Sequence, residues 1–205
     1  MKAPFRLLFT LGSAGSLLTL VGFAFWQQDL KYSRPTPKPA LLKEVPFGGQ
    51  LDLPGVPRFG DGWPLFLHFF NPSCPCSRFN LDHVRTLVRQ NKEKVHFVAV
   101  LQGDSAGKLQ KQFAALGLDI ASVPDTDGKI AAACGVYSTP QAVILDGNGR
   151  LFFRSNYNVS RYCQAPGTEF ARIALESLLA GKPAPVFPEA AMVAYGCELP
   201  ANLKK

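Results

Sequence analysis

Two cysteines separated by one proline are the residues of this sequence best suited to chemistry. Cys74, Pro75 and Cys76 join an apolar run, Pro64–Phe70, to an amphipathic run, Phe79–Val88. If the first run is a strand and the second a helix, both thiols lie at the N-terminus of the helix. Unpaired backbone N–H groups and the positive end of the helix dipole favour a thiolate there. Proline suits a first helical turn, because its missing N–H is not needed. The pattern therefore indicates redox chemistry at these thiols.

The three remaining cysteines, Cys134, Cys163 and Cys197, leave several pairings open. Five cysteines is an odd number, so at least one is unpaired or forms a transient bond. We expect Cys134 to be a small buried apolar residue. Cys163 and Cys197 could form a structural disulfide that ties an irregular insert to the C-terminal tail, as suits an oxidising compartment. Alternatively, Cys163 could resolve a bond made by Cys74.

The elements that must position the thiols follow from the hydrophobic pattern. The run Leu65–Phe70 is apolar except for His68, as is typical of a central strand buried on both faces. From this strand onward we expect the order β-α-β-α-α-β-β-α, which predicts an α/β sheet covered by helices on both faces. The later elements are expected at residues 79–88, 95–101, 105–116, 129–134, 142–146, 151–154 and 168–179, the two last strands forming a hairpin.

A long uncharged run, Leu7–Trp26, precedes the α/β region. As a helix it would span about 30 Å, the thickness of a bilayer core. Lys2 and Arg6 come before it, so we expect the N-terminus to stay in the cytoplasm and the rest of the chain to cross the membrane. The alternative is a cleaved signal peptide with a loose site at Gly22-Phe23-Ala24, although the apolar part of a signal peptide is usually only about 7–15 residues long.

Composition and these runs together predict five segments. They are a cytoplasmic N-terminus (1–6), a transmembrane anchor (7–26), a proline-rich stalk (27–50), an α/β domain (51–183) and a tail (184–205). With 47% apolar and 18% charged residues, the chain can form one substantial core. The net charge of +7 is spread without a Lys/Arg cluster, so we expect contact with a lipid bilayer but not with nucleic acid.

Two motifs resemble those of a known family. The sequences F-F-N-P-S-C-P-C-S-R-F (69–79) and V-Y-S-T-P-Q-A-V-I-L-D-G-N-G-R-L (136–151) resemble membrane-tethered thioredoxin-like and redoxin proteins of the bacterial periplasm. The resemblance covers about Leu51–Gly181. It implies a thioredoxin-like fold in which Pro140, after Thr139, is cis and lies beside Cys74. It also implies an inner-membrane protein whose partners are protein thiols or disulfides in the periplasm, without a cofactor.

The motif departs from the Cys-x-x-Cys of thioredoxins, because the second cysteine position is Ser77. In one interpretation Cys74 attacks and Cys76 resolves, through a tight Cys-x-Cys disulfide. In the other, Cys74 acts as a Cys-x-x-Ser thiol that Cys163, Cys76 or an external thiol resolves. His68 stands where related thioredoxins keep a buried acid. It could move a proton or favour the thiolate, or it could be a core histidine.

The leading hypothesis is therefore a thiol–disulfide oxidoreductase with Cys74 and Cys76 as catalytic residues. A thiol peroxidase is an alternative, although Asn71 stands where the peroxiredoxin pattern has a threonine. A copper-binding or metal-delivery module is another, because paired thiolates are soft ligands. The copper-assembly relatives of the fold use Cys-x-x-x-Cys and a later histidine, and no histidine follows His96 here. We therefore expect no metal. A non-catalytic docking domain is the last alternative.

Overall fold

The computed structural model describes residues 2–159 and 165–202. The chain splits after Arg34 into two compact units. The first unit is a single helix, α1 (Lys2–Ser33). Within it, Pro4–Gln27 is long and apolar enough to cross a membrane, a property that a signal sequence shares. The helix thus extends beyond both ends of the predicted anchor, and it takes in the first residues of the predicted stalk.

The rest of the predicted stalk belongs to the second unit, because it contacts the α/β domain directly. The backbone N–H of Thr36 donates to Ala194 O at 2.8 Å, and its side chain lies 3.0 Å from that of Ser138. Val45 packs against buried residues of the domain, and Gln50 forms a bridge with Arg150. These contacts distinguish residues 35–50 from a free-standing spacer.

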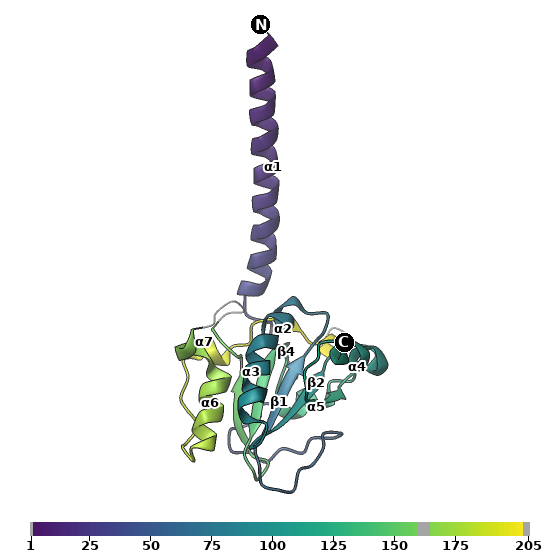
Figure 1. The fold of residues 1–205 in the computed structure, drawn as a ribbon, viewed down its shortest axis with the longest axis vertical. Coiled ribbons are helices and arrows are strands. Elements are labelled where there is room, and N and C mark those ends of the chain that lie inside the picture. Colours follow the sequence, from purple (N-terminus) through teal and green to yellow (C-terminus); the bar gives the residue numbers. More distant parts are fainter. Residues whose placement is uncertain (1, 160–164, 203–205) are drawn as a thin grey trace. The chain divides into compact units, whose positions relative to one another are not determined.

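A five-stranded mixed sheet forms the centre of the second unit (Figure 1). The strand order is β3-β2-β1-β5-β6, with β1 parallel to β2, β2 parallel to β3, and both β5 and β6 antiparallel to their neighbours. The bounds are Leu65–Phe70 for β1, His96–Leu101 for β2, Ala121–Pro124 for β3, Gln141–Leu145 for β5 and Leu151–Ser155 for β6. The central strand β1 has the bounds that the sequence predicted.

Helices cover both faces of this sheet, and each face has its own core. On one face, apolar side chains of α3 (Leu81–Asn91), α4 (Ala106–Ala114) and α6 (Phe170–Leu179) pack with Phe66 and Phe70 of β1. On the other face, α5 (Lys129–Cys134) packs with the alternate β1 residues Leu67 and Phe69. Successive strand residues point to opposite faces, which explains why a strand buried on both sides is almost wholly apolar. This is the predicted thioredoxin-like fold.

The structure differs from the sequence-based elements at several places, and it adds the two-residue strand β4 (Ser138–Thr139). Strand β3 was not predicted, and the helix after the cysteines is divided into α2 (Pro75–Phe79) and α3 at Asn80, which ends the first helix. The C-terminal tail contains regular structure as well. Its elements are α7 (Glu189–Met192), the short strand β7 (Cys197–Glu198) and a 3₁₀ turn, Pro200–Asn202; a second such turn, Pro166–Thr168, precedes α6.

Candidate redox site

The loop that follows β1 places Cys74 at the start of α2. The side-chain oxygen of Asn71 accepts the N–H of Ser73 at 2.9 Å, and the N–H of Cys74 donates to Asn71 O at 3.0 Å. Cys74 is the extended residue just before the helix, and Pro75 occupies its first turn. Such a turn suits Asn, whose side chain accepts a hydrogen bond from the backbone two residues on. The predicted position of Cys74 and Cys76 at a helix N-terminus is confirmed.

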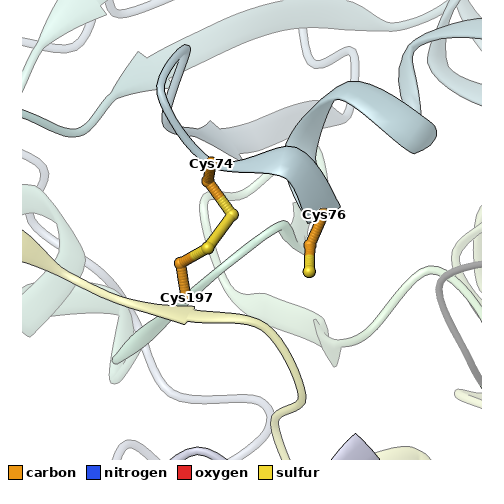
Figure 2. A group of neighbouring side chains, drawn as sticks. All are labelled: Cys74, Cys76 and Cys197. Atoms are coloured by element: carbon orange, nitrogen blue, oxygen red, sulfur yellow. A yellow bond between two sulfur atoms is a disulfide. The ribbon is translucent and has the colours of Figure 1, made fainter. Parts of the chain in front are cut away.

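Cys74 forms a disulfide with Cys197, with 6.2 Å between the Cα atoms (Figure 2). The predicted Cys74–Cys76 disulfide is therefore not the one present, and Cys197 is not paired with Cys163. Cys163 itself lies outside the described residues. The physical reason is the tail, which returns across 123 residues of sequence and carries Cys197 to the turn that holds Cys74. Cys76 is a buried thiol whose Sγ lies within 4.8 Å of both bonded sulfurs.

The tail reaches the site as strand β7, which pairs antiparallel with β4 (Ser138–Thr139). Thr139 is opposite Cys197 in this pair, and the peptide bond from Thr139 to Pro140 is cis, as the resemblance implied. The Sγ of Cys74 lies 3.7 Å from Thr139 O. A disulfide sulfur carries no proton, so this is a van der Waals contact that a reduced Cys74 thiol could convert into a weak hydrogen bond. The predicted placement of Thr139 beside Cys74 is confirmed.

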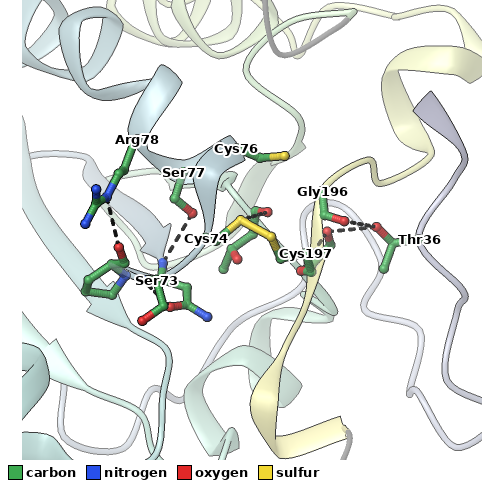
Figure 3. Close-up of a disulfide and its surroundings, with 12 residues drawn as sticks. Thr36, Ser73, Cys74, Cys76, Ser77, Arg78, Gly196 and Cys197 are labelled. Carbon is green, nitrogen blue, oxygen red and sulfur yellow. Dashed lines mark hydrogen bonds between the residues drawn. A yellow bond between two sulfur atoms is a disulfide. The ribbon is translucent and has the colours of Figure 1, made fainter. Parts of the chain in front are cut away.

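The close approach of β7 to β4 requires the glycine that precedes Cys197. Gly196 has φ +153°, and a Cβ there would lie 2.2 Å from Thr139 O. The carbonyl of Gly196 accepts the hydroxyl of Thr36 at 3.3 Å, and the Ser138 hydroxyl donates to Cys197 O at 3.2 Å (Figure 3). These bonds fix the tail strand beside the disulfide.

Ser77, which replaces the second cysteine of Cys-x-x-Cys, holds the turn together. Its side chain is fully buried, and its Oγ accepts the N–H of Asn71 at 3.3 Å (Figure 3). The next residue, Arg78, donates from Nε to Pro72 O at 3.1 Å. Both side chains therefore tie α2 to the loop that carries Cys74.

His68 lies on the central strand β1 and is fully buried, with its Nδ1 2.7 Å from the hydroxyl of Tyr157. Burial, with a smaller contribution from His83, lowers the pKa of His68 to about 3. Its ring also contacts Phe70. A neutral imidazole adds no positive charge that could favour a thiolate, so this geometry is that of a core histidine held by a tyrosine side chain.

Cys134 is a buried apolar residue, as predicted. It is 0% exposed within the core that α5 forms against the sheet. Burial, assisted by the negative charge of Asp125, raises the pKa of the Cys134 thiol to about 12. An inert thiol is the expected consequence, because the thiolate is the reactive form.

A known protein family matches most of the chain. The family described as "Domain of unknown function (DUF6436)" matches residues 56–198, which include the cysteine turn, the cis proline and the tail strand. A search of curated proteins finds no match.

Two solved structures share the fold over most of both chains, and a third matches over a smaller part. An uncharacterized conserved protein from Geobacillus kaustophilus is 24% identical, with a TM-score of 0.65 over 81% of this chain and 96% of that one. A hypothetical protein from Sinorhizobium meliloti 1021 is 18% identical, with a TM-score of 0.63 over 77% of this chain and 95% of that one. A putative thiol:disulfide interchange protein DsbE from Chlorobium tepidum is 20% identical, with a TM-score of 0.47 over 60% and 81%.

Proposed function

Because the chain belongs to the DUF6436 family, whose description names no activity, we propose a function from the site itself. The chain is a thiol–disulfide oxidoreductase of the bacterial cell envelope that exchanges disulfides with protein thiols. Its redox couple is Cys74–Cys197, and Cys76 is a third thiol of the same centre.

The observation that carries this proposal is the cluster of three sulfurs beside a cis proline. The Sγ atoms of Cys74, Cys76 and Cys197 all lie within 4.8 Å of one another. A disulfide exchanges when a thiolate attacks one of its sulfurs, so neighbouring thiols can pass the bond between them. Attack of a Cys76 thiolate on the sulfur of Cys74 would form Cys74–Cys76 and release Cys197 as a thiolate. This transfer needs no external oxidant, because one disulfide replaces another.

The envelope location is supported by the N-terminal helix and by the disulfide. The apolar segment Pro4–Gln27 has the length of a membrane span, and Lys2 and Arg6 lie at its start. Disulfides persist in oxidising compartments such as the periplasm. We therefore propose a single-pass inner-membrane protein with its N-terminus in the cytoplasm and its second unit in the periplasm.

The test is a redox titration of the full chain in detergent. The protein is equilibrated with glutathione buffers, its thiols are trapped in acid, and the cysteines are mapped by mass spectrometry. We expect Cys74–Cys197 to be reduced and to reform reversibly, at a potential above about −300 mV, the upper bound for structural disulfides. A Cys134→Ala variant serves as the matched control, because it removes a buried thiol away from this centre. A disulfide that never cycles would refute the proposal.

A second candidate function rests on the same sulfur cluster. When the disulfide is reduced, three thiolates within 4.8 Å of one another form a soft donor set of the kind that binds Cu(I). Titration of the reduced full chain with Cu(I) against a competing chelator tests it. One equivalent bound in the wild type, and none in Cys197→Ser, would favour metal binding. Equal affinity in the two proteins would exclude this site.

A further inference from the structure

We propose that a thiolate of the partner protein attacks the Sγ of Cys197 on the tail strand, and that the buried Cys74 is the leaving group. This inference deepens the proposed function and rests on it. It reverses the assignment made from the sequence, in which Cys74 itself meets the partner.

Exposure of the three cysteines is the first observation. Cys74 and Cys76 are each 2% exposed, whereas Cys197 is partly exposed. Glu198, the other residue of β7, is also partly exposed. An attacking sulfur must reach the sulfur with which it bonds, and accessibility therefore governs which sulfur is attacked. Of the three clustered sulfurs, the one on the tail belongs to the most accessible residue.

The second observation is that the tail occupies the strand edge beside the cis proline. A partner can bind by adding an extended strand to an exposed edge. Here β7 pairs with β4 in that position, and Thr139 is opposite Cys197. The Thr36 side chain bonds to Gly196 O beside it (Figure 3). An incoming peptide therefore meets the tail strand before it meets Cys74.

The third observation is that the tail is built into the domain, so that it does not simply move aside. Ala191 and Ala194 are 0% exposed, and Leu199 is 1% exposed in the core on the α5 face. The Ser155 hydroxyl donates to Ala191 O, and the Asn156 side-chain amide donates to Val193 O. Opening the path to Cys74 would break these contacts on both sides of Cys197. Attack on Cys197 requires none of them to break.

The exchange proceeds through a mixed disulfide between the partner and Cys197. A partner thiolate attacks the Sγ of Cys197 and forms a mixed disulfide. The Cys74–Cys197 bond breaks, its electron pair leaves on the Sγ of Cys74, and this thiolate takes up a proton. A second thiol of the partner then attacks the partner's own sulfur and releases Cys197. The partner dithiol is oxidised to a disulfide, and the Cys74–Cys197 pair is reduced by two electrons.

Pulse labelling of the wild-type full chain tests the inference without any substitution. The protein is reduced with a phosphine, the reductant is removed, and N-ethylmaleimide is applied under native conditions for graded times before mass mapping. We expect Cys197 to be labelled at least tenfold faster than Cys74 and Cys76. Labelling of Cys74 at the same rate as Cys197, or faster, would overturn the inference.

Two variants give the same answer through a disulfide probe. Cys74→Ser and Cys197→Ser are each prepared in a Cys76→Ser background, checked for folding by circular dichroism, and treated with oxidised glutathione. We expect the mixed disulfide to form at Cys197 at least tenfold faster than at Cys74. Faster formation of the mixed disulfide at Cys74 than at Cys197 would refute the inference. The proposed function would still stand if the wild-type disulfide cycled reversibly. A wild-type disulfide inert in glutathione buffers would refute both.

Discussion

His68 is a buried histidine whose surroundings keep its ring neutral. The ring is fully buried, its Nδ1 bonds to Tyr157, and its pKa is lowered to about 3, chiefly by burial. Among residues 2–159 and 165–202, its Nε2 has no hydrogen-bond partner. In the unfolded chain the pKa of histidine is about 6.5. The fold therefore favours the neutral form, and protonation works against folding.

This difference predicts how stability depends on pH. The contribution of neutral His68 is complete above pH ~6.5 and is lost as the pH falls from ~6.5 toward the folded pKa. Between pH 7 and pH 4.5 we expect the wild type to lose about 2–3 kcal/mol more unfolding free energy than His68→Gln loses. Urea unfolding of both proteins at each pH measures it. If the unfolding free energies of the two proteins changed with pH in parallel, folding would not lower the pKa of His68.

Cys134 provides a second prediction about a single residue. Its raised pKa and its burial predict that iodoacetamide at pH 8 will leave it unmodified in the folded protein. Addition of urea beyond the unfolding midpoint should make it react like a free thiol. Mass mapping of the alkylated peptides follows both states. Rapid modification under native conditions would show that the α5 face of the sheet opens readily.

Among the elements, the short strand β7 depends most clearly on one glycine. In Gly196→Ala the new Cβ would lie 2.2 Å from Thr139 O, so β7 must move away from β4. We expect a loss of about 1–3 kcal/mol in unfolding free energy, as for other overpacked sites. Less Cys74–Cys197 disulfide should also form at a given glutathione ratio, because the two sulfurs are no longer held together.

Gly107 in α4 offers the matched control for this substitution. A Cβ at Gly107 has nothing within 4 Å, and the residue lies inside a helix. Gly107→Ala should therefore be neutral or stabilise by up to about 1 kcal/mol, with an unchanged disulfide titration. Equal effects of the two substitutions would contradict the role assigned to the contact between β7 and β4.

The elements that could be predicted from sequence are those whose residues specify them locally. Strand β1 is an apolar run interrupted only by His68, and α5 ends at Cys134, where Gly135 follows with a φ of +69° that suits a glycine after a helix. Strands β3 and β7 have four and two residues, too few for a hydrophobic period to be recognised. Both are strands because a neighbouring strand supplies hydrogen bonds, which is information from the tertiary structure.

The candidate site likewise combines features that the local sequence specifies with one that depends on the fold of the whole molecule. The position of Cys74 after a buried strand could be predicted from adjacent residues, and the cis proline from a family resemblance. The bond between Cys74 and Cys197 joins residues 123 positions apart. Only the path of the tail across the domain brings Cys197 to Cys74, and no spacing in the sequence records that path. Five cysteines allow several pairings, and their positions in the sequence do not indicate which one forms.

The chain divides into two compact units, one of which is a single apolar helix. Residues 35–205 should fold alone as a soluble protein with the Cys74–Cys197 disulfide, because both cores lie in this unit. The full chain should remain in the membrane fraction after carbonate extraction, since Pro4–Gln27 is apolar and its side chains are exposed. Thermal unfolding midpoints of the two proteins should agree within error.

The N-terminus of the purified full chain decides between an anchor and a signal peptide. Intact mass spectrometry should find the residues before Leu7 still present, and an alkaline phosphatase fused after Lys205 should be active, because Lys2 and Arg6 favour a cytoplasmic N-terminus. A mass that begins just after Ala24 would instead identify a cleaved signal peptide. The second unit would then be released from the membrane, and its partners would be sought among soluble envelope proteins.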